Sequence, residues 1–411
     1  MKRYPKYKDS GVKWIGEIPE HWNVPRLKSL CISMKSGDNL TALDIKEDGA
    51  YKVYGGNGIR GYYHLCNVSK ECILIGRQGA LCGNVHYVNE PIWATDHAVV
   101  TFSAKNTDIK YLFHLTTAMN LNQYASQTAA QPGLAVGAIG RIYTCLPPLD
   151  EQQAIVAYLD EKVGKIDRYI SEKEKEIVAL DELKQATIAN AVTRGLDPNA
   201  PLKDSGIKWI GNIPQHWEVK QMRNYLTLVS EKNHPEKQLL SVTREQGVII
   251  RNTESKEENH NYIPDDLSGY KYVKEGQFVI NKMKSWQGSY GVSDYEGIVS
   301  PAYYVCDLSF PCKEFFSKAV RSKAYIPFFT QYSKGIRVDQ WDLSTIGLKT
   351  IPFIEPPIEE QQAIVDYINT KTAKIDQMKD GIKSEIEKLK EYKQRLISDV
   401  VTGKVCVKGE K

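Results

Sequence analysis

One stretch near the N-terminus of this chain recurs almost unchanged in its middle. Lys8–Trp22 reads KDSGVKWIGEIPEHW and Lys203–Trp217 reads KDSGIKWIGNIPQHW, with twelve of fifteen positions identical at an offset of 195 residues. A second pair follows, because Pro147–Asp167 and Pro356–Asp376 share 13 of 21 positions at an offset of 209. Such self-similarity indicates that one supersecondary unit is built twice. The fold must therefore accommodate two related halves.

The segments between these shared stretches differ. Residues 23–146 and 218–355 align poorly, and the second is 14 residues longer, as the change of offset from 195 to 209 requires. We interpret the shared parts as doing one mechanical job twice. The divergent parts are then expected to make different contacts.

Each shared PP-x-x-EQQ stretch opens a long helical pattern. Pro147–Pro148 and Pro356–Pro357 can start a helix, because the first turn does not use the N–H group that proline lacks. Acidic residues follow at once, where the helix dipole favours them. Both patterns stop beside a glycine, in Val192–Gly195 and Val401–Lys404, and glycine suits a helix C-cap. Each predicted helix of about 43 residues would be roughly 65 Å long at ~1.5 Å per residue.

Both predicted helices carry one apolar stripe in a heptad pattern. In the first half the a and d positions are Val156, Leu159, Val163, Ile166, Ile170, Lys173, Ile177, Leu180, Lys184, Thr187 and Ala191. In the second half they are Val365, Ile368, Thr372, Ile375, Lys379, Ile382, Ile386, Leu389, Lys393, Leu396 and Val400. Eight of eleven are apolar in each half, and a helix with one apolar stripe must bury it against a partner. We expect each helix to bury its stripe against its own copy.

The pairing is expected to be antiparallel, because the chain must return after its second half. An antiparallel pair of related helices has an approximate two-fold axis, which would carry one divergent domain to each end in inverted orientation. The backbone of duplex DNA has the same two-fold symmetry. Lys184 and Lys393 occupy equivalent seam positions, and two interpretations stay open: a polar residue that fixes the register, or a lysine that snorkels at the edge of a loose seam.

The predicted fold class is therefore α+β. Two mixed α/β domains are joined by two long helices that form an antiparallel coiled coil with pseudo-two-fold symmetry. The predicted boundaries are 1–148 for the first lead and domain, 149–196 for the first helix, 197–357 for the second lead and domain, and 358–411 for the second helix and tail. Strands are predicted at Glu71–Gly76, Ala98–Phe102, Gly247–Ile250, Gln277–Ile280 and Ser300–Val305, a glycine-dense turn at Tyr54–Gly61, and a helix at Lys313–Phe329.

Composition narrows the class of protein further. No apolar run approaches the roughly 20 residues that span a bilayer, and the charged start MKRYPKYKDSG is not a secretory signal. We therefore expect a cytoplasmic protein that is not associated with a membrane. Its eight cysteines are predicted to be reduced thiols. A zinc site from Cys66, Cys72, Cys82 and His86 is conceivable, but its spacings fit no usual pattern. The net charge of +4 is too small to indicate nucleic-acid binding by itself, so any DNA-facing charge must be local.

Several loops of the divergent domains combine basic, amide and aromatic groups beside glycine. The candidate DNA-binding residues are Asn57, Arg60, Arg77, Gln78, Asn84 and His97 in the first domain, and Lys282, Lys284, Ser285, Gln287, Tyr290, Arg337 and Gln340 in the second. Arg and Lys can donate to guanine, Asn and Gln can pair with adenine, and Ser and Tyr suit phosphates. For each of them a solvated loop side chain is the alternative. Trp14, Trp22, Trp209 and Trp217 of the shared leads are interpreted as packing anchors.

Motifs for catalysis are absent from the sequence. There is no G-x-x-x-x-G-K-[S/T] phosphate loop. Pro264–Asp265 is not followed within thirty residues by the acidic-x-Lys element of a metal-dependent nuclease, and no Asn/Asp-Pro-Pro-aromatic tetrapeptide for amine methylation occurs. We expect no catalytic residues and no metal. Two alternatives stay open: a scaffold with two non-DNA binding modules, and a fused modification enzyme, which the missing motifs oppose.

In combination these features resemble the HsdS-type specificity subunits of type I restriction–modification systems over nearly the whole chain. The G-x-I-P-x-H-W leads and P-P-x-x-E-Q-Q helices resemble that family's shared regions. YGGNGIRGY (Tyr54–Tyr62), ILIGRQGALCG (Ile73–Gly83) and QPGL (Gln131–Leu134) resemble segments of its target-recognition domains. The second domain departs from this pattern, with NKMKSWQGSYG (Asn281–Gly291) where an R-x-G element would stand.

The resemblance implies a DNA-recognition subunit without catalytic activity. Each domain would read one half of a bipartite site on double-stranded DNA, and the helices would set the spacer. Two methyltransferase subunits and the restriction subunits would dock on the shared regions, and S-adenosylmethionine, ATP and magnesium would bind those partners and not this chain. The residues expected to serve docking and the spacer are Gln152, Gln153, Ile166, Ile170, Ile177, Leu180, Gln361, Gln362, Ile375, Ile382, Ile386 and Leu389.

Overall fold

The computed structural model describes residues 3–79, 81–126, 133–253, 263–335 and 341–407. The chain divides into two compact units. Unit 1 comprises residues 1–174 together with 383–411, and unit 2 comprises residues 175–382. Each unit contains one divergent domain and one end of each long helix.

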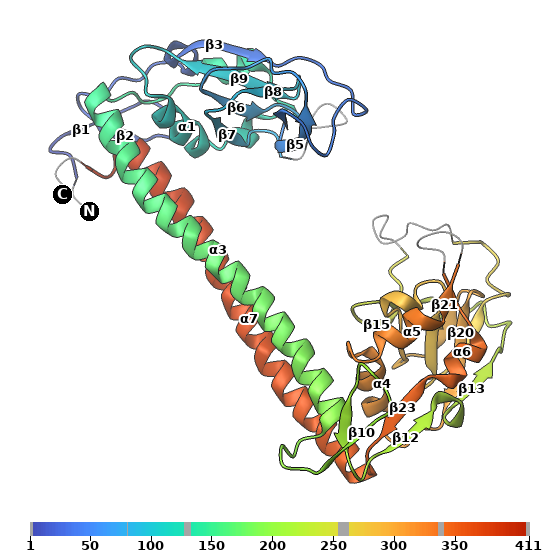
Figure 1. Ribbon diagram of the computed structural model, residues 1–411. Helices are drawn as coiled ribbons and strands as arrows, with labels where there is room; N and C mark the ends of the chain where they lie inside the picture. The colour runs from blue at the N-terminus through green and yellow to red at the C-terminus, as the bar shows by residue number, and fades with distance from the viewer. Residues whose placement is uncertain (1–2, 80, 127–132, 254–262, 336–340, 408–411) are drawn as a thin grey trace. The chain divides into compact units, whose positions relative to one another are not determined.

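Both long helices form as predicted. α3 spans Leu149–Arg194 and α7 spans Ile358–Val401, 46 and 44 residues long (Figure 1). Each begins directly after its proline pair, where the missing N–H group is harmless. Gly195 and Gly403 follow the helix ends with φ of 72° and 75°, a left-handed conformation that glycine adopts without strain.

Within each unit the segments of α3 and α7 pair along the predicted seam in an antiparallel register. In unit 2, Lys184 lies three residues after Asp181, while its partner Asp376 lies three residues before Lys379, the partner of Asp181. In unit 1, Lys173 lies after Asp167, while its partner Glu385 lies before Lys393, the partner of Asp167. The apolar seam residues that are less than a tenth exposed are Leu159, Ile170, Leu180, Ala191, Val365, Ile368, Ile375, Ile382, Ile386, Leu396 and Val400. The antiparallel coiled coil is thus confirmed.

The domain of unit 1 is built on a four-stranded antiparallel sheet. Its strand order is β3 (Cys31–Ser36), β9 (Ala98–Ser103), β6 (Cys72–Gly76) and β7 (Val85–Val88). A second sheet orders β5 (Gly58–Tyr63), β4 (Tyr51–Gly55) and β8 (Ile92–Ala94). The lead forms a hairpin of β1 (Tyr7–Asp9) and β2 (Glu17–Pro19). The helices are α1 (Ile109–Ala118), α2 (Val136–Arg141) and the 3₁₀ turns Leu27–Leu30 and Leu121–Tyr124.

The core of unit 1 lies between this sheet and its helices. α1 contacts β6, β7 and β9, and one apolar cluster joins the lead, the sheet, α1 and both long helices. Ile73 and Ile75 of β6 are fully buried in it, as expected for a central strand whose apolar residues run without interruption.

The domain of unit 2 has its own four-stranded antiparallel sheet, in the order β13 (Leu226–Val229), β20 (Tyr303–Leu308), β17 (Phe278–Asn281) and β18 (Tyr290–Val292). Paired strands are β10 (Leu202–Asp204) with β11 (Asn212–Pro214), β12 (Glu218–Gln221) with β23 (Pro352–Glu355), and β14 (Leu240–Thr243) with β15 (Gly247–Ile250). Further pairs are β16 (Lys271–Val273) with β19 (Gly297–Val299), and β21 (Ser333–Lys334) with β22 (Asp342–Leu343). The helices are α4 (Lys313–Arg321), α5 (Ile326–Tyr332), α6 (Thr345–Thr350) and the 3₁₀ turns Met222–Asn224 and Ser285–Gln287.

The two domains share one sheet topology although their sequences align poorly. In each sheet the strand that comes first in the sequence pairs with the last, the last pairs with the second, and the second pairs with the third. β3, β9, β6 and β7 therefore correspond to β13, β20, β17 and β18. This equivalence was not visible in the sequence.

Two predicted elements of unit 2 needed correction. The single helix expected at Lys313–Phe329 is two helices, α4 and α5, with Ser322 in extended conformation at φ −69° and ψ 155° between them. Pro327 follows in the first turn of α5, where a proline is tolerated. The strand expected at Ser300–Val305 begins at Tyr303. Across the described residues, no helix has the length and apolar character needed to cross a bilayer.

Candidate nucleic-acid interface

Four of the candidate DNA-binding residues of unit 1 line one open hollow. Asn57 and Arg60 lie on the β4–β5 hairpin, Gln78 follows β6, and His97 precedes β9, and together they line a hollow of about 430 Å³. The hairpin side chains Asn57 and Arg60 and the loop side chain Gln78 are exposed. Three segments that are distant in sequence thus present polar groups to one open surface.

Glycines explain how the hairpin comes so close to the end of β6. A Cβ atom on Gly76 would lie 1.9 Å from the carbonyl oxygen of Gly56, and one on Gly56 would lie 3.1 Å from the carbonyl oxygens of Gln78 and His97. Only glycine permits this backbone approach. The glycine-dense segment is therefore a means of packing the hairpin turn against the sheet.

The remaining two candidates of unit 1 hold this hollow in shape. Asn84 Nδ2 donates to Asn57 Oδ1 at 2.6 Å. The Arg77 guanidinium donates to Ser36 Oγ at 3.1 Å, and the Arg77 N–H donates to the His97 carbonyl at 2.8 Å. Arg77 is half-buried. The structure thus brings all six predicted residues together, with Arg77 and Asn84 beside the four that line the hollow.

A second hollow of unit 1 is rich in amide groups and was missed in the sequence. Asn84, Asn120, Asn122 and Gln394 line it together with His86, in a volume of about 460 Å³. Burial lowers the pKa of His86, so its ring is neutral near pH 7. Gln394 comes from α7, more than 270 residues after the other amides, and no local pattern could have grouped them.

In unit 2 the candidate lysines lie in the loop that follows β17. Lys284 is exposed, and Lys282 Nζ lies 2.9 Å from Asp342 Oδ2 in an ion pair. This aspartate raises the pKa of Lys282. Gln287 is half-buried at the end of the same loop. Since β17 corresponds to β6, this loop occupies the place in the topology that Arg77 and Gln78 occupy in unit 1.

Two candidates of unit 2 belong to its core, which corrects the prediction that they contact DNA. Ser285 is fully buried, and its hydroxyl lies 3.1 Å from Ser333 Oγ. Tyr290 is fully buried, and its ring stacks on Phe329 at 3.9 Å. A side chain without exposed surface cannot reach a base edge in this conformation. Arg337 and Gln340 lie outside the described residues.

The shared leads make the same contact in both units. In unit 1, Trp22 Nε1 donates to Glu151 Oε2 at 3.0 Å, and His21 Nε2 lies 2.8 Å from Glu151 Oε1. In unit 2, Trp217 Nε1 donates to Glu360 Oε2 at 2.9 Å, and His216 bonds the other oxygen of Glu360. Each lead is therefore clamped to the first turn of its long helix.

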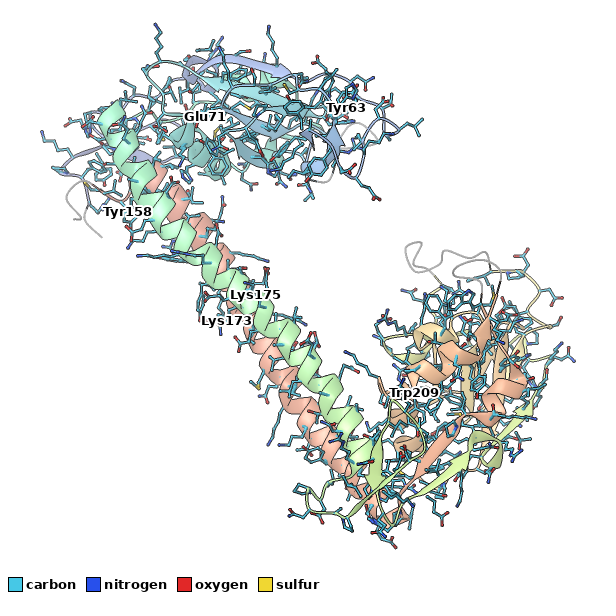
Figure 2. All side chains as sticks on the ribbon, viewed as in Figure 1. Tyr63, Glu71, Tyr158, Lys173, Lys175 and Trp209 are labelled. Carbon is cyan, nitrogen blue, oxygen red and sulfur yellow. The ribbon has the colours of Figure 1, made fainter. Side chains whose placement is uncertain are left out.

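The prediction that the lead tryptophans are packing anchors is confirmed for three of the four. Trp22 and Trp217 are fully buried, and the half-buried Trp14 donates to the Tyr143 carbonyl at 3.0 Å. Trp209, labelled in Figure 2, is 45% exposed and meets Phe328 only edge to face. It anchors less than its counterparts do.

The glutamine pairs of the PP-x-x-EQQ stretches divide into a buried and an exposed member. Gln152 is fully buried, donates to the carbonyls of Pro147 and Asn106, and accepts from the Asp108 N–H. Gln361 is buried and donates to the Pro356 carbonyl. These two residues hold the helix start and are covered within this chain. Gln153 and Gln362 are exposed and remain predicted docking residues.

The described residues contain no group of three or more His, Cys, Asp or Glu side chains arranged to hold a metal ion. The four residues of the conceivable zinc site do not form one: Cys72 and Cys82 are buried in different apolar clusters.

Comparison with protein families matches residues 19–179 to the type I restriction modification DNA specificity domain. The specificity subunit of the type I restriction enzyme EcoprrI from Escherichia coli is 45% identical over 134 residues, which are 32% of this chain and 33% of that protein. The chain thus spans a third of that relative. The MjaVIII specificity subunit of Methanocaldococcus jannaschii is 23% identical over 422 residues and covers 95% of both chains.

A solved structure shows the same fold. It was determined to explain complex assembly and conformational transition of the type I R-M system, and the alignment covers 93% of this chain and 98% of that one with a TM-score of 0.63. At 14% sequence identity, the likeness is one of architecture.

Proposed function

Because the chain belongs to the HsdS-type specificity subunits of type I restriction–modification systems, we propose that it recognises a bipartite DNA site. Each divergent domain would read one half-site, and the paired helices would set the spacer between the halves. The matched DNA specificity domain covers the whole predicted site of unit 1.

The observation that carries this proposal is the convergence of Asn57, Arg60, Gln78 and His97 on one open hollow. Arg can donate two hydrogen bonds to guanine O6 and N7, and Asn and Gln can pair with adenine N6 and N7. Such groups discriminate between bases only when the backbone holds them in place. Here the glycine contacts and the Asn84–Asn57 hydrogen bond supply that support.

For unit 2 we propose the loop after β17 as the corresponding reading surface, with Lys284, Lys282 and Gln287 as its polar groups. The common sheet topology supports this assignment. Because Lys282 is ion-paired with Asp342, its contact with DNA would require exchange of that carboxylate for a base or phosphate. Lys284 is the more direct candidate.

The proposal assigns catalysis to other chains. Two methyltransferase subunits would dock on the shared regions and restriction subunits would join them, with S-adenosylmethionine, ATP and magnesium bound there and none of them by this chain. Such a complex works on DNA in the cytoplasm. Exposed Gln153 and Gln362, in equivalent positions of the two helices, are the proposed docking residues.

The experiment that tests the proposal measures binding of the full chain, with its methyltransferase partners, to random duplex DNA over a series of salt concentrations. A protein that neutralises phosphates releases counterions, so its binding constant should fall steeply with salt. Methylome sequencing of a host that carries the system then gives the modified motif. A bipartite motif is expected; a flat salt response would instead support a scaffold for non-DNA partners.

A further inference from the structure

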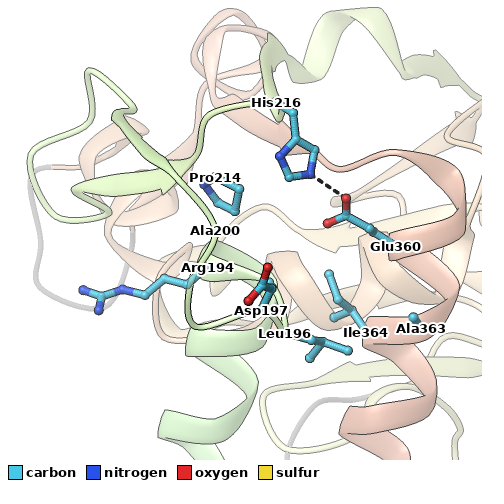
Figure 3. A pocket seen from close by; sticks show the side chains of 10 residues that line it. Arg194, Leu196, Asp197, Ala200, Pro214, His216, Glu360, Ala363 and Ile364 are labelled. Carbon is cyan, nitrogen blue, oxygen red and sulfur yellow. Dashed lines mark hydrogen bonds and ion pairs between the residues drawn. The ribbon is translucent and has the colours of Figure 1, made fainter.

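A small pocket of unit 2 lies between the lead and the start of α7. Its volume is about 240 Å³ (Figure 3). One wall comes from the stretches that both halves share, and it consists of Pro214, His216, Glu360, Ala363 and Ile364. The segment that links α3 to the lead closes the other side with Arg194–Asp197 and Ala200. The pocket therefore offers the Glu360 carboxylate beside His216, the aliphatic side chains of Leu196 and Ile364, and a second carboxylate from Asp197.

Unit 1 contains the same wall, residue for residue. Offsets of 195 in the lead and 209 in the helix give the identical residues Pro19, His21, Glu151, Ala154 and Ile155. In unit 1, however, a side chain of the chain itself covers this wall. Tyr4 is 8% exposed and packs on His21 and Trp22, with ring centroids 5.9 and 5.8 Å apart. Its hydroxyl donates to Glu151 Oε2 at 3.1 Å.

The second lead has no such tyrosine. The position equivalent to Tyr4 is Asn199, which is exposed and is not among the residues that line the pocket. The carboxylates of Glu151 and Glu360 differ accordingly in exposure and in the groups that donate to them. The Glu151 side chain is 6% exposed with donors from Tyr4, His21 and Trp22, whereas the Glu360 side chain is 39% exposed with donors from His216 and Trp217.

We infer that this pocket binds the side chain of a tyrosine contributed by another polypeptide. The ring would lie against His216 and the aliphatic wall, and its hydroxyl would donate to Glu360, as Tyr4 does to Glu151 in unit 1. Tyrosine combines a large apolar surface with one hydrogen bond, which suits an interface anchor. The inference rests on the proposed function only for the partner's identity, which would be a subunit docking on the shared region.

The test uses two small molecules that reproduce side chains, p-cresol for tyrosine and toluene for phenylalanine. The full chain carries ¹³C-labelled alanine and isoleucine methyl groups, and binding is followed through the signals of Ala200, Ala363 and Ile364. We expect p-cresol to shift these signals and to bind roughly tenfold more tightly than toluene, because only p-cresol donates to a carboxylate. Equal binding of both molecules, or no shift up to the solubility limit of p-cresol, would overturn the inference.

Two variants provide matched controls within the same chain. Asn199→Tyr supplies the ring of unit 1 in unit 2, so p-cresol should no longer shift the Ile364 signal. Tyr4→Ala opens the equivalent wall of unit 1, so p-cresol should now shift Ile155 and raise the melting temperature of the variant. Because these readouts need neither DNA nor partner subunits, a failure here is distinct from a failure of DNA recognition.

Discussion

Lys184 of α3 donates to both carboxylate oxygens of Asp376 on α7, at 2.8 and 2.6 Å. In unit 1, Lys393 of α7 donates to Asp167 of α3 at 2.6 Å. Lys393 and Asp376 are the counterparts of Lys184 and Asp167 at the repeat offset of 209, so one contact is made twice with the roles of the helices exchanged.

This contact favours the interpretation that the seam lysines fix the register. A slip of one heptad would place Lys184 opposite Asn369 or Lys383 in place of Asp376. The first loses the ion pair, and the second brings like charges together.

We predict a measurable coupling between these two residues. Lys184→Met and Asp376→Asn should each lower the free energy of unfolding slightly, with a coupling energy of about 0.3–1 kcal/mol, because the Asp376 side chain is 48% exposed and water screens the pair. A double-mutant cycle by urea denaturation measures it. The same cycle on Lys393 and Asp167 is the internal control, and additive effects at both pairs would contradict a role in register.

Glu151 and Glu360, which hold the leads to the long helices, should differ in their contribution to the free energy of unfolding. Glu151→Ala leaves the buried Trp22 Nε1–H and Tyr4 hydroxyl without their acceptor, which should lower the free energy of unfolding by about 2–4 kcal/mol. Glu360→Ala should have a smaller effect, because the Glu360 side chain is 39% exposed and water can replace it. Urea denaturation of both variants compares them, and equal losses would show that exposure does not decide the effect.

The proposed reading surface predicts effects that are specific to one half-site. Arg60→Ala should weaken DNA binding by about 1–3 kcal/mol and relax base preference in a single half-site, and Lys284→Ala should act on the other half. Competition binding with duplexes altered in one half measures this. Tyr290→Phe is the matched control in unit 2, since its buried hydroxyl has no hydrogen-bond partner among the described residues, and it should leave binding unchanged.

The paired helices α3 and α7 should set the length of the spacer between the two half-sites. Deleting residues 174–180 from α3 and 380–386 from α7 removes one heptad from each helix. The Lys184–Asp376 and Lys393–Asp167 pairs on either side stay in register, and Lys173 loses its partner Glu385. The pair becomes about 10 Å shorter at ~1.5 Å per residue, and the spacer of the modified motif should shrink by up to about three base pairs with both half-sites intact. Methylome sequencing reads the result; an unchanged spacer would mean that the helices do not set it.

Mild acid should destabilise unit 1 through His114. Burial lowers the pKa of this histidine below its ordinary 6.5, although Asp160 opposes the shift. Between the lowered pKa of His114 in the folded chain and its ordinary value, the unfolded chain binds more protons than the folded one. The free energy of unfolding should therefore fall as the pH drops below about 6.5. His114→Gln should reduce this dependence, measured by urea denaturation between pH 5 and 7. The substitution His64→Gln at an exposed position is the control and should leave the slope unaltered.

The sequence alone determined the duplication, both long helices and their seam. These features are local or periodic: proline pairs open the helices, glycines close them, and heptads recur every seven residues. It also selected the polar groups of the first hollow, because glycines beside Asn57, Arg60 and Gln78 mark places where backbones must come close. The contact between each lead and its long helix could be expected only in part. The His-Trp and Glu-Gln-Gln motifs recur in both halves, but nothing in the sequence shows that they contact each other.

Only the tertiary structure shows which residues these sequence patterns contact and which of them are buried. The common sheet topology of the two domains depends on long-range strand pairing, which different sequences satisfy equally well. Ser285 and Tyr290 were predicted to lie on the surface but are buried in the core, because a short sequence pattern does not show whether a polar residue faces solvent or the interior. The difference between Tyr4 and Asn199 shows the same point, since one substitution outside the repeat leaves a filled wall in one unit and a pocket in the other.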